Sequence, residues 1–327
     1  MTENRRDLRL YLPVYLIVVL VYLVAGYLSP DFFTWRNNVN LFSRVTPLVL
    51  AGLAQTIVTL SGGLDLSIGS IISLCCVIGA SMPWVDTPAN VFLWAVCPPL
   101  AGALMGFING LIVGLMKFPP FIVTLSTSAI WLGVAIFILP EPGGEVSMAA
   151  AEFVGGNLWG VPIPLILFLF FVLACHLLVT RTAMGRAIYA VGGDENIAVQ
   201  SGIHPARVWL FSYTLGGVLC GFAGAYQSAW MFSADPLVGE PYVMNSIAVT
   251  VIGGTALTGG RGGVAGVIGG AYIFYLINNV LNLLAISTFY QYIAKGLILI
   301  VALVISSPET LSRIRGLGRK IAGGSVR

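Results

Sequence analysis

Charge is scarce in this chain. Only 9% of its 327 residues are charged and 57% are hydrophobic, whereas soluble domains average about 25% charged and about 45–50% apolar. Apolar runs near the roughly 20 residues that cross a bilayer recur throughout the sequence. We expect ten spans, at residues 10–28, 45–61, 66–82, 92–116, 121–139, 163–179, 208–230, 243–257, 264–285 and 289–305. The sequence therefore predicts an all-α, polytopic membrane bundle in a single domain, residues 1–327, with no room for a soluble catalytic domain.

The residues that carry most catalytic chemistry are also few. The two histidines, His176 and His204, lack the HExxH spacing of a zinc protease. The five cysteines form no CxxC pair and fall in or beside spans, so we expect them to be packing residues. None of the three lysines belongs to a phosphate-binding P-loop. We therefore expect neither a metal nor a cofactor in this chain, and no enzymatic activity.

The few charges are unevenly distributed. With the N-terminus inside and ten alternating spans, thirteen Lys and Arg residues fall on the inner side and two, Arg36 and Arg44, on the outer side. This asymmetry follows the positive-inside rule. It predicts that residues 1–9, 180–207 and 306–327 are cytoplasmic. The outer loops carry acids instead, namely Glu141, Glu145, Glu152, Asp235 and Glu240.

One segment of the chain occurs twice. Residues 58–70 read VTLSGGLDLSIGS and residues 249–261 read VTVIGGTALTGGR, with six identities in an ungapped alignment 191 positions apart. Each copy ends an apolar run on a glycine pair, where the chain can leave a helix without a Cβ penalty. We expect helix breaks at Gly62, Gly63, Gly253 and Gly254. Paired interruptions in an apolar chain are typical of a transport pathway, and a duplication without a site is the alternative.

Asp65 is the main ionisable side chain near a break. A carboxylate at the bilayer centre costs about 2.5–3.5 kcal/mol, so such groups usually face a cavity or a partner. Three roles stay open for Asp65: N-cap of the next span together with Ser67, contact at an inner gate, or contact with substrate. The aligned position of the second copy is Ala256, so the repeat does not build a pair of carboxylates. Lys295, inside the last expected span, could snorkel outward or pair within the bundle.

Uncharged polar side chains inside the spans are better candidates for a pathway. They offer hydrogen-bond donors and acceptors without charge, which suits the hydroxyl groups of a neutral solute. Each of them could instead bond a neighbouring helix, a contact worth about 0.6 kcal/mol. Besides Ser67, the candidates are Asn109, Thr124, Ser126, Ser128, Asn245, Asn278, Asn279 and Asn282.

The two longest connections differ in kind. Residues 139–162 are rich in glycine, proline and acids, which suits either a solvated linker or an external docking surface. Within residues 180–207, Asp194 is a good N-cap for a short helix at 196–201, and Gly202 can end that helix. Glu195 suits the dipole of its first turn. A capped helix outside the bilayer either transmits motion to a soluble subunit or is surface structure.

Four motifs together resemble one known family. They are GGLDLSIGS at 62–70, PPFIVTLSTSAIWLG at 119–133, MGRAIYAVGGDENIAVQSGI at 184–203 and GGTALTGGRGGVAGVIGG at 253–270. In this order they resemble the permease subunits of ribose-type ABC importers, and the resemblance covers nearly the whole chain. The acidic stretch at 194–196 and residues 255–258 depart slightly from the family pattern.

The resemblance implies an importer of a small sugar or polyol in the bacterial inner membrane. It implies two permease subunits, cytoplasmic ATPase subunits that bind ATP and Mg, a periplasmic binding protein, and no nucleic acid. A secondary transporter, which usually carries more buried ionisable groups, and a non-transporting scaffold are the alternatives. The implied ATPase-coupling residues are Arg186, Gly192, Gly193, Asp194, Glu195, Asn196, Ala198, Ser201 and Gly202.

Overall fold

Helices make up nearly all of the described chain. A computed structural model describes residues 3–28, 30–81, 87–287, 289–294, 296–297 and 300. Within these residues, six helices are long and apolar enough to cross a membrane. They are α2 (Trp35–Leu60), α4 (Pro88–Met116), α5 (Pro120–Ile138), α7 (Ile163–Arg181), α10 (Pro205–Met231) and α12 (Val264–Leu283). The expected all-helical, multi-pass membrane bundle is therefore confirmed.

Three further apolar helices complete the bundle, α1 (Glu3–Leu28), α3 (Ile68–Ser81) and α11 (Glu240–Ile252). The 13 residues of α11 extend over about 20 Å, less than the roughly 30 Å hydrocarbon core. The span expected at 243–257 is therefore wrong at both ends. The helix starts three residues earlier and stops before the glycine pair, whose backbone turns out of the helix. Lys295 and residues 298–299 and 301–305 of the expected last span lie outside the described residues, as does the tail 306–327.

Several short elements were not expected from the sequence. The 3₁₀-helix η1 (Pro30–Phe33) precedes α2, and α8 (Ala183–Gly193) follows α7. The short helix expected at 196–201 is present as α9 (Glu195–Gln200), between α8 and α10. The long connection after α5 folds into α6 (Met148–Gly155) and a hairpin of β1 (Asn157–Leu158) and β2 (Val161–Pro162). The helix α6 forms because Ala150 and Val154 bury an apolar stripe against Trp94 and Tyr226. A stripe this short is easily overlooked in a loop rich in glycine and proline.

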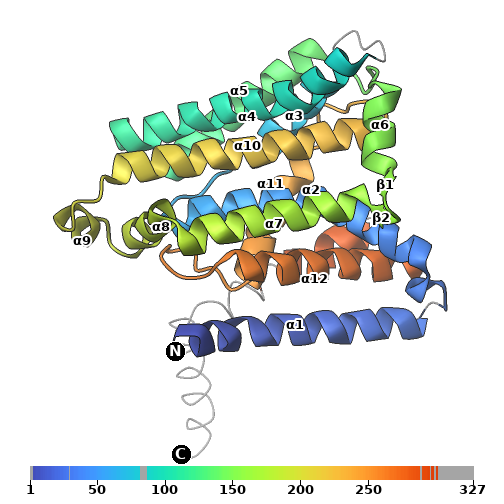
Figure 1. Cartoon of the computed structure of the whole chain (residues 1–327), viewed down its shortest axis with the longest axis horizontal. Coiled ribbons are helices and arrows are strands. Elements are labelled where there is room, and N and C mark those ends of the chain that lie inside the picture. Colours follow the sequence, from blue (N-terminus) through green and yellow to red (C-terminus); the bar gives the residue numbers. More distant parts are fainter. Residues whose placement is uncertain are drawn as a thin grey trace, which may run out of the picture.

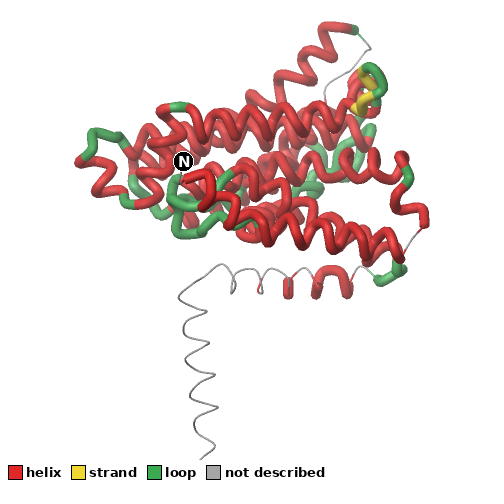
Figure 2. The backbone as a smooth tube through the Cα atoms, turned by 60° about the horizontal axis from the view of Figure 1, so that its bottom comes forward, coloured by secondary structure: helices red, strands yellow, loops and turns green. Residues whose placement is uncertain are grey.

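The long helices lie side by side, and the short elements gather at their two ends. Figure 1 shows α8 and α9 at one end of the bundle, together with the start of α1. We refer to this as the α9 end. The helix α6 and both strands lie at the opposite end, the α6 end (Figures 1 and 2). The helix α1 lies at the edge of the bundle, where it packs on α12.

The helix α3 forms the centre of the bundle. Nearly all of its side chains are buried, and α2, α4, α5, α10 and α11 all contact it. The pair α4 and α10 packs with its backbones in contact, since a Cβ at Gly217 would overlap the carbonyl of Gly102. Small residues at membrane helix interfaces allow this close approach. This packing fixes the start of α3 against α10 and so positions the site described next.

Candidate functional site

The first glycine pair ends α2. Gly62 has a left-handed conformation, with φ +85°, which glycine adopts without a steric cost. The Gly62 N–H donates to the Thr59 carbonyl at 2.9 Å, and the Gly63 N–H donates to the Val58 carbonyl at 3.0 Å. This pair of bonds is a Schellman motif, which satisfies carbonyls that the helix end would otherwise leave unpaired.

The second glycine pair ends α11 in the same geometry. Gly254 is left-handed, with φ +83°. Its N–H donates to the Val251 carbonyl at 2.9 Å, and the Thr255 N–H donates to the Thr250 carbonyl at 3.0 Å. The left-handed Gly254 thus corresponds to Gly62, an offset of 192 rather than the 191 of the ungapped alignment. Residue identities do not say which glycine of a pair turns left-handed; the helical register decides it.

The end of α2 and the loop that follows α11 meet the last turn of α8. The Gly260 N–H, in the loop after α11, donates to the Leu60 carbonyl at 3.1 Å. A Cβ at Gly192, near the end of α8, would overlap the same Leu60 carbonyl, and one at Gly259 would lie 2.9 Å from the Gly62 Cα. Three segments more than 60 residues apart in the chain therefore touch through glycine backbone.

Beyond the first break, the chain turns into the bundle interior. Asp65 is buried, and its Oδ1 accepts hydrogen bonds from the Ser67 N–H at 2.8 Å and the Ser67 hydroxyl at 2.6 Å. Ser67, not Asp65, directly precedes α3, and its carbonyl accepts from the Ile71 N–H. Asp65 is therefore not the N-cap of α3. Its carboxylate instead holds the turn before the helix.

Side chains from three other helices converge on this turn. Asn109 of α4 donates to the Ser67 Oγ at 2.8 Å, and Thr124 of α5 donates to the Leu64 carbonyl at 3.2 Å. From α10, Trp209 donates to the Ser61 carbonyl at 2.9 Å and Tyr213 donates to the Leu64 carbonyl at 3.3 Å. We call residues 61–67 with these four side chains the buried turn network.

Four predicted pathway residues, Asp65, Ser67, Asn109 and Thr124, thus lie together in the buried turn network. All four are nearly or fully buried within the subunit. Their polar groups hold the turn in place rather than line an open surface. The Asn109 Oδ1 has no hydrogen-bond partner among the described residues.

The other predicted pathway residues do not join this network. Ser126 is exposed on α5 and donates to the Ile122 carbonyl, and Asn245 is half-buried on α11. Asn278 and Asn279 are half-buried on α12, and the Asn282 Oδ1 accepts from Gln291 at 2.8 Å. The structure therefore divides the candidates into a buried set near the start of α3 and an accessible set on α5, α11 and α12.

Sequence reasoning missed a second buried polar contact, between α2 and α11. The hydroxyls of Thr56 and Thr250 lie 3.1 Å apart, and Gln55 donates to Thr59 at 3.4 Å. All four side chains are fully buried. The two threonines of the repeated Val-Thr pair were the available signal. The helices, however, pair Thr250 with Thr56 instead of the aligned Thr59.

The connection between α7 and α10 contains the short capped helix. The Asp194 carboxylate accepts from the N–H groups of Asn196 and Ile197 at 2.9 and 3.1 Å. Ala198 faces the bundle, with 2% of its surface exposed, whereas Ile197 and Val199 are 61% and 53% exposed. The glycine pair 192–193 closes α8 instead of lying in a loop. Two apolar side chains of α9 therefore point away from the chain's own core.

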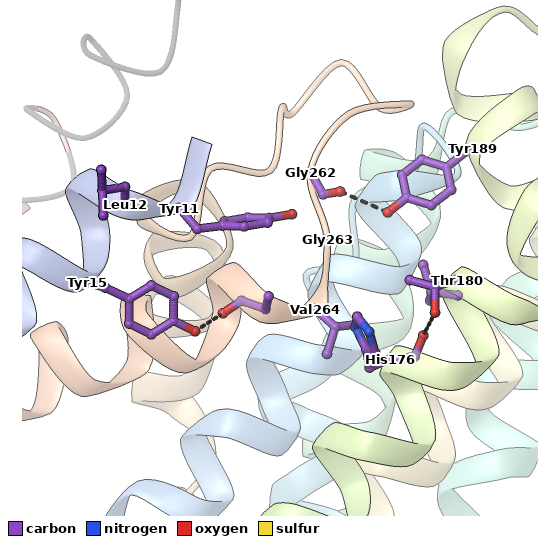
Figure 3. A pocket seen from close by; sticks show the side chains of 11 residues that line it. Tyr11, Leu12, Tyr15, His176, Thr180, Tyr189, Gly262, Gly263 and Val264 are labelled. Atoms are coloured by element: carbon purple, nitrogen blue, oxygen red, sulfur yellow. Dashed lines mark hydrogen bonds between the residues drawn. The ribbon is translucent and has the colours of Figure 1, made fainter. Parts of the chain in front are cut away.

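A cavity of about 350 Å³ lies at the α9 end, between α1, α7, α8 and the start of α12 (Figure 3). Tyr189 donates to the Gly262 carbonyl at 2.8 Å, and Tyr15 donates to the Ala265 carbonyl at 2.7 Å. His176 also lines the cavity. No predicted pathway residue does so. The tyrosines anchor α1 and α8 to the chain segment that follows the second break.

The described residues contain no group of three or more His, Cys, Asp or Glu side chains able to hold a metal ion. The five thiols are free, and four of them are buried, which fits their expected packing role.

Comparisons with known proteins identify the family to which this chain is similar. Residues 37–303 match the family described as branched-chain amino acid transport system / permease component. The chain is 35% identical over 303 residues to a ribose import permease protein of Bacillus subtilis, covering 92% of each chain. It is 34% identical over 297 residues to the D-allose transport system permease protein of Escherichia coli K12, covering 89% of this chain and 90% of the relative.

A fructose import permease protein of Rhizobium meliloti is 34% identical over 309 residues, covering 89% of this chain and 83% of the relative. No solved structure matches the chain. Coverage of this extent, with motifs that run from the first glycine break to the second, leaves no major part of the chain unexplained. The chain therefore belongs to this family of transport-system permeases, as a ribose-type ABC permease subunit that carries no enzymatic activity of its own.

Proposed function

We propose that this chain forms one half of the pore of an ATP-driven importer for a small sugar or polyol in the bacterial inner membrane. Its relatives are named for import of ribose, allose and fructose. A binding protein delivers the solute at the α6 end, and ATPase subunits bind ATP and Mg at the α9 end. The second half of the pore is another copy of this chain or a similar permease.

The distribution of basic residues supports this orientation. Arg36 begins α2 at the α6 end. At the α9 end, Lys117 follows α4, Arg181 ends α7 and Arg207 begins α10. Basic residues favour the cytoplasmic side of the membrane. The α9 end is therefore cytoplasmic, and both termini lie there in the proposed ten-span topology.

The observation that carries the coupling proposal is the exposed apolar surface of α9. Ile197 and Val199 are more than half exposed on a helix that lies outside the spans. Burying them in a cleft of an ATPase subunit is favourable, at about 25 cal/mol per Å² of apolar surface. The coupling residues Arg186, Glu195, Ser201 and Gly202 flank this surface on α8, α9 and the following turn.

Movement of α9 reaches the pore through α8. The Gly192 backbone lies against the Leu60 carbonyl and Gly260, which belong to the two helix breaks. A shift of α8 therefore acts on the ends of α2 and α11 together. We propose that the two Schellman ends are the duplicated elements of an internal repeat, and that their displacement opens the pore to the cytoplasm.

Reconstitution tests this function. The tagged chain is purified from its host membranes with its associated subunits and placed in vesicles. Uptake of labelled D-ribose, D-allose and D-fructose is then measured with ATP and with a non-hydrolysable analogue. We expect uptake of one of these sugars with ATP and no uptake with the non-hydrolysable analogue. Uptake driven by an ion gradient without ATP would identify a secondary transporter instead.

The coupling role of α9 needs a probe that spares the fold. Ala198→Arg is unsuitable, because Ala198 is buried within this chain. Ile197→Asp places a charge on the exposed apolar surface, and Gln200→Asp, at an exposed polar position of the same helix, is the matched control. We expect Ile197→Asp to lose ATPase co-purification and uptake while Gln200→Asp keeps both. Normal association in Ile197→Asp would make α9 surface structure.

A further inference from the structure

The sequence suggests that Glu240 lies in an outer loop, but the structure places it in a helix. It is the first residue of α11, and α11 begins deep in the bundle. The Gly239 N–H donates to the Ser73 Oγ at 2.9 Å. The Gly239 carbonyl packs so closely on Gly69 that a Cβ there would lie 2.5 Å from its oxygen. The first turn of α11 is therefore level with the first two turns of α3.

The depth of this turn follows from α3. Ala80, near the end of α3, has a carbonyl that accepts from the Glu145 N–H of the connection at the α6 end. The residues of α3 that contact Gly239 are Ser73 and Gly69. An α-helix rises roughly 10 Å from Ser73 to Ala80 and roughly 16 Å from Gly69 to Ala80. The hydrocarbon core is about 30 Å thick. Glu240 therefore lies near the middle of the membrane.

At this depth, the Glu240 side chain is exposed on the subunit surface. Leu237, Pro241 and Met244 are exposed beside it. Within the part of the chain that the structure describes, the Glu240 carboxylate forms no hydrogen bond or ion pair. A carboxylate at the bilayer centre costs about 2.5–3.5 kcal/mol and usually faces water or a partner. This face of α11 is therefore not a lipid-facing surface.

The exposed face of α7 shows the contrast. Leu169, Phe170, Leu173 and Leu177 are exposed there, and all are apolar. Such a stripe suits contact with lipid chains. The helix α11, by comparison, exposes the Glu240 carboxylate in its first turn.

We infer that the first turn of α11 lines the aqueous translocation pathway, where the Glu240 carboxylate accepts hydrogen bonds from the hydroxyl groups of a neutral sugar. This inference rests on the proposed function. A carboxylate offers two oxygens that accept several hydroxyl donors, and bonds to a charged acceptor are stronger than neutral ones. Water in the pathway keeps the carboxylate solvated between passages of substrate.

Thiol labelling of the assembled transporter tests the position. The probe is a permanently charged, membrane-impermeant methanethiosulfonate, which reacts with thiolates in water, and the native chain supplies the background. The variant is Glu240→Cys. Two controls bracket it: Glu152→Cys, an exposed acid of α6, and Leu173→Cys, 57% exposed on α7. A thiol in apolar surroundings stays protonated and inert.

We expect Glu240→Cys to react like Glu152→Cys and unlike Leu173→Cys. Transported sugar added to the binding protein, compared with the binding protein alone, should slow only the Glu240→Cys reaction. A Glu240→Cys thiol that stays unreactive, or that crosslinks to a second permease without reacting with the probe, would overturn the inference, since the face would then contact lipid or protein.

Transport measurements distinguish a sugar-binding role of the Glu240 carboxylate from a structural role. We expect Glu240→Ala to lower ATP-driven uptake roughly 10-fold or more, as loss of a charge-assisted hydrogen bond predicts, while ATPase association and ATP hydrolysis stay near wild type. Glu240→Asp should recover part of the uptake. Wild-type uptake in Glu240→Ala would overturn the inference about Glu240 and leave the proposed function standing. Failure of the wild-type transporter to need ATP would overturn the proposed function instead.

Discussion

The two glycine breaks share one backbone geometry and lead into different surroundings. After α2, residues 61–67 enter the bundle, and Trp209, Tyr213 and Thr124 donate to their carbonyls. After α11, Leu257, Thr258 and Arg261 are exposed in a loop at the α9 end. A Schellman end thus satisfies a helix terminus equally well in both places, because it uses backbone groups alone.

The difference shows that only the first break reaches the bundle interior. A buried carbonyl needs a donor, whereas an exposed one can bond water. The buried turn network supplies those donors from α5 and α10, and Asn109 of α4 donates to the Ser67 Oγ, so the first break is linked to the packing of the bundle. The second break is linked to it through α8 and the Gly260 contact with Leu60.

The contact that joins both breaks should be the most sensitive position. A Cβ at Gly192 would overlap the Leu60 carbonyl, whereas one at Gly193 would meet no atom within 4 Å. Gly192→Ala should therefore destabilise the protein by about 1–3 kcal/mol, the usual cost of overpacking, and abolish uptake. Gly193→Ala is the matched control and should leave both unchanged. Thermal unfolding of the purified permease and vesicle uptake measure the two effects, and equal behaviour of the two variants would contradict the contact.

Removing the Asp65 carboxylate of the first break should have the second-largest effect. Asp65→Ala leaves the buried N–H and hydroxyl of Ser67 without their acceptor, which costs about 1–3 kcal/mol. Asp65→Asn keeps an acceptor oxygen and should cost less. The reverse change at the second break, Ala256→Asp, should be nearly neutral, because that loop is partly exposed. These shifts are read from unfolding midpoints.

Uptake by the same variants distinguishes two roles of Asp65. If Asp65→Asn assembles normally with the ATPase and yet transports nothing, the negative charge itself is needed. That result would favour a charge-dependent gate over the structural role.

The left-handed glycines should respond alike if the two helix ends are equivalent. Gly62→Ala and Gly254→Ala each place a Cβ at φ above +80°, at a cost of about 1–2 kcal/mol. We expect unfolding shifts of similar size for both. Gly253→Ala is not a clean control, because its Cβ would meet Gly266 at 2.6 Å. A large effect at Gly62 with none at Gly254 would mean that the second end tolerates rearrangement.

The smallest expected effect is an energetic coupling between substitutions at Gly63, in the first break, and at Tyr213 of α10. A Cβ at Gly63 would lie 2.7 Å from the Tyr213 hydroxyl oxygen. Tyr213→Phe removes that oxygen, so the double variant should cost less than the sum of Gly63→Ala and Tyr213→Phe. Neighbours of this kind couple by about 0.5 kcal/mol or more. Additive free energies of unfolding would show that the hydroxyl simply moves aside.

Local features of the site could be predicted from the sequence because they depend on neighbouring residues. Asp194 followed by a short polar–apolar stretch predicted the capped helix, and the glycine pairs predicted where α2 and α11 stop. The N-cap interpretation of Asp65, one of three that the sequence left open, failed by two residues, since Asx side chains also bond the backbone two residues ahead. Apolar pattern alone likewise placed Glu240 in a loop, because a helix that begins inside a bundle has no signature of its own.

By itself, the sequence determined that this protein is a helical membrane permease, because the bilayer demands long apolar runs and four motifs occur in the order of one family. Only the tertiary structure decided which polar residues are buried and which are exposed, which glycine of each pair turns left-handed, and that α8 touches both breaks. The burial and the α8 contacts arise between segments that are distant in the chain, and the choice of glycine follows from where the packed helix ends. The packing of whole helices, rather than any local pattern, selects which of those contacts form.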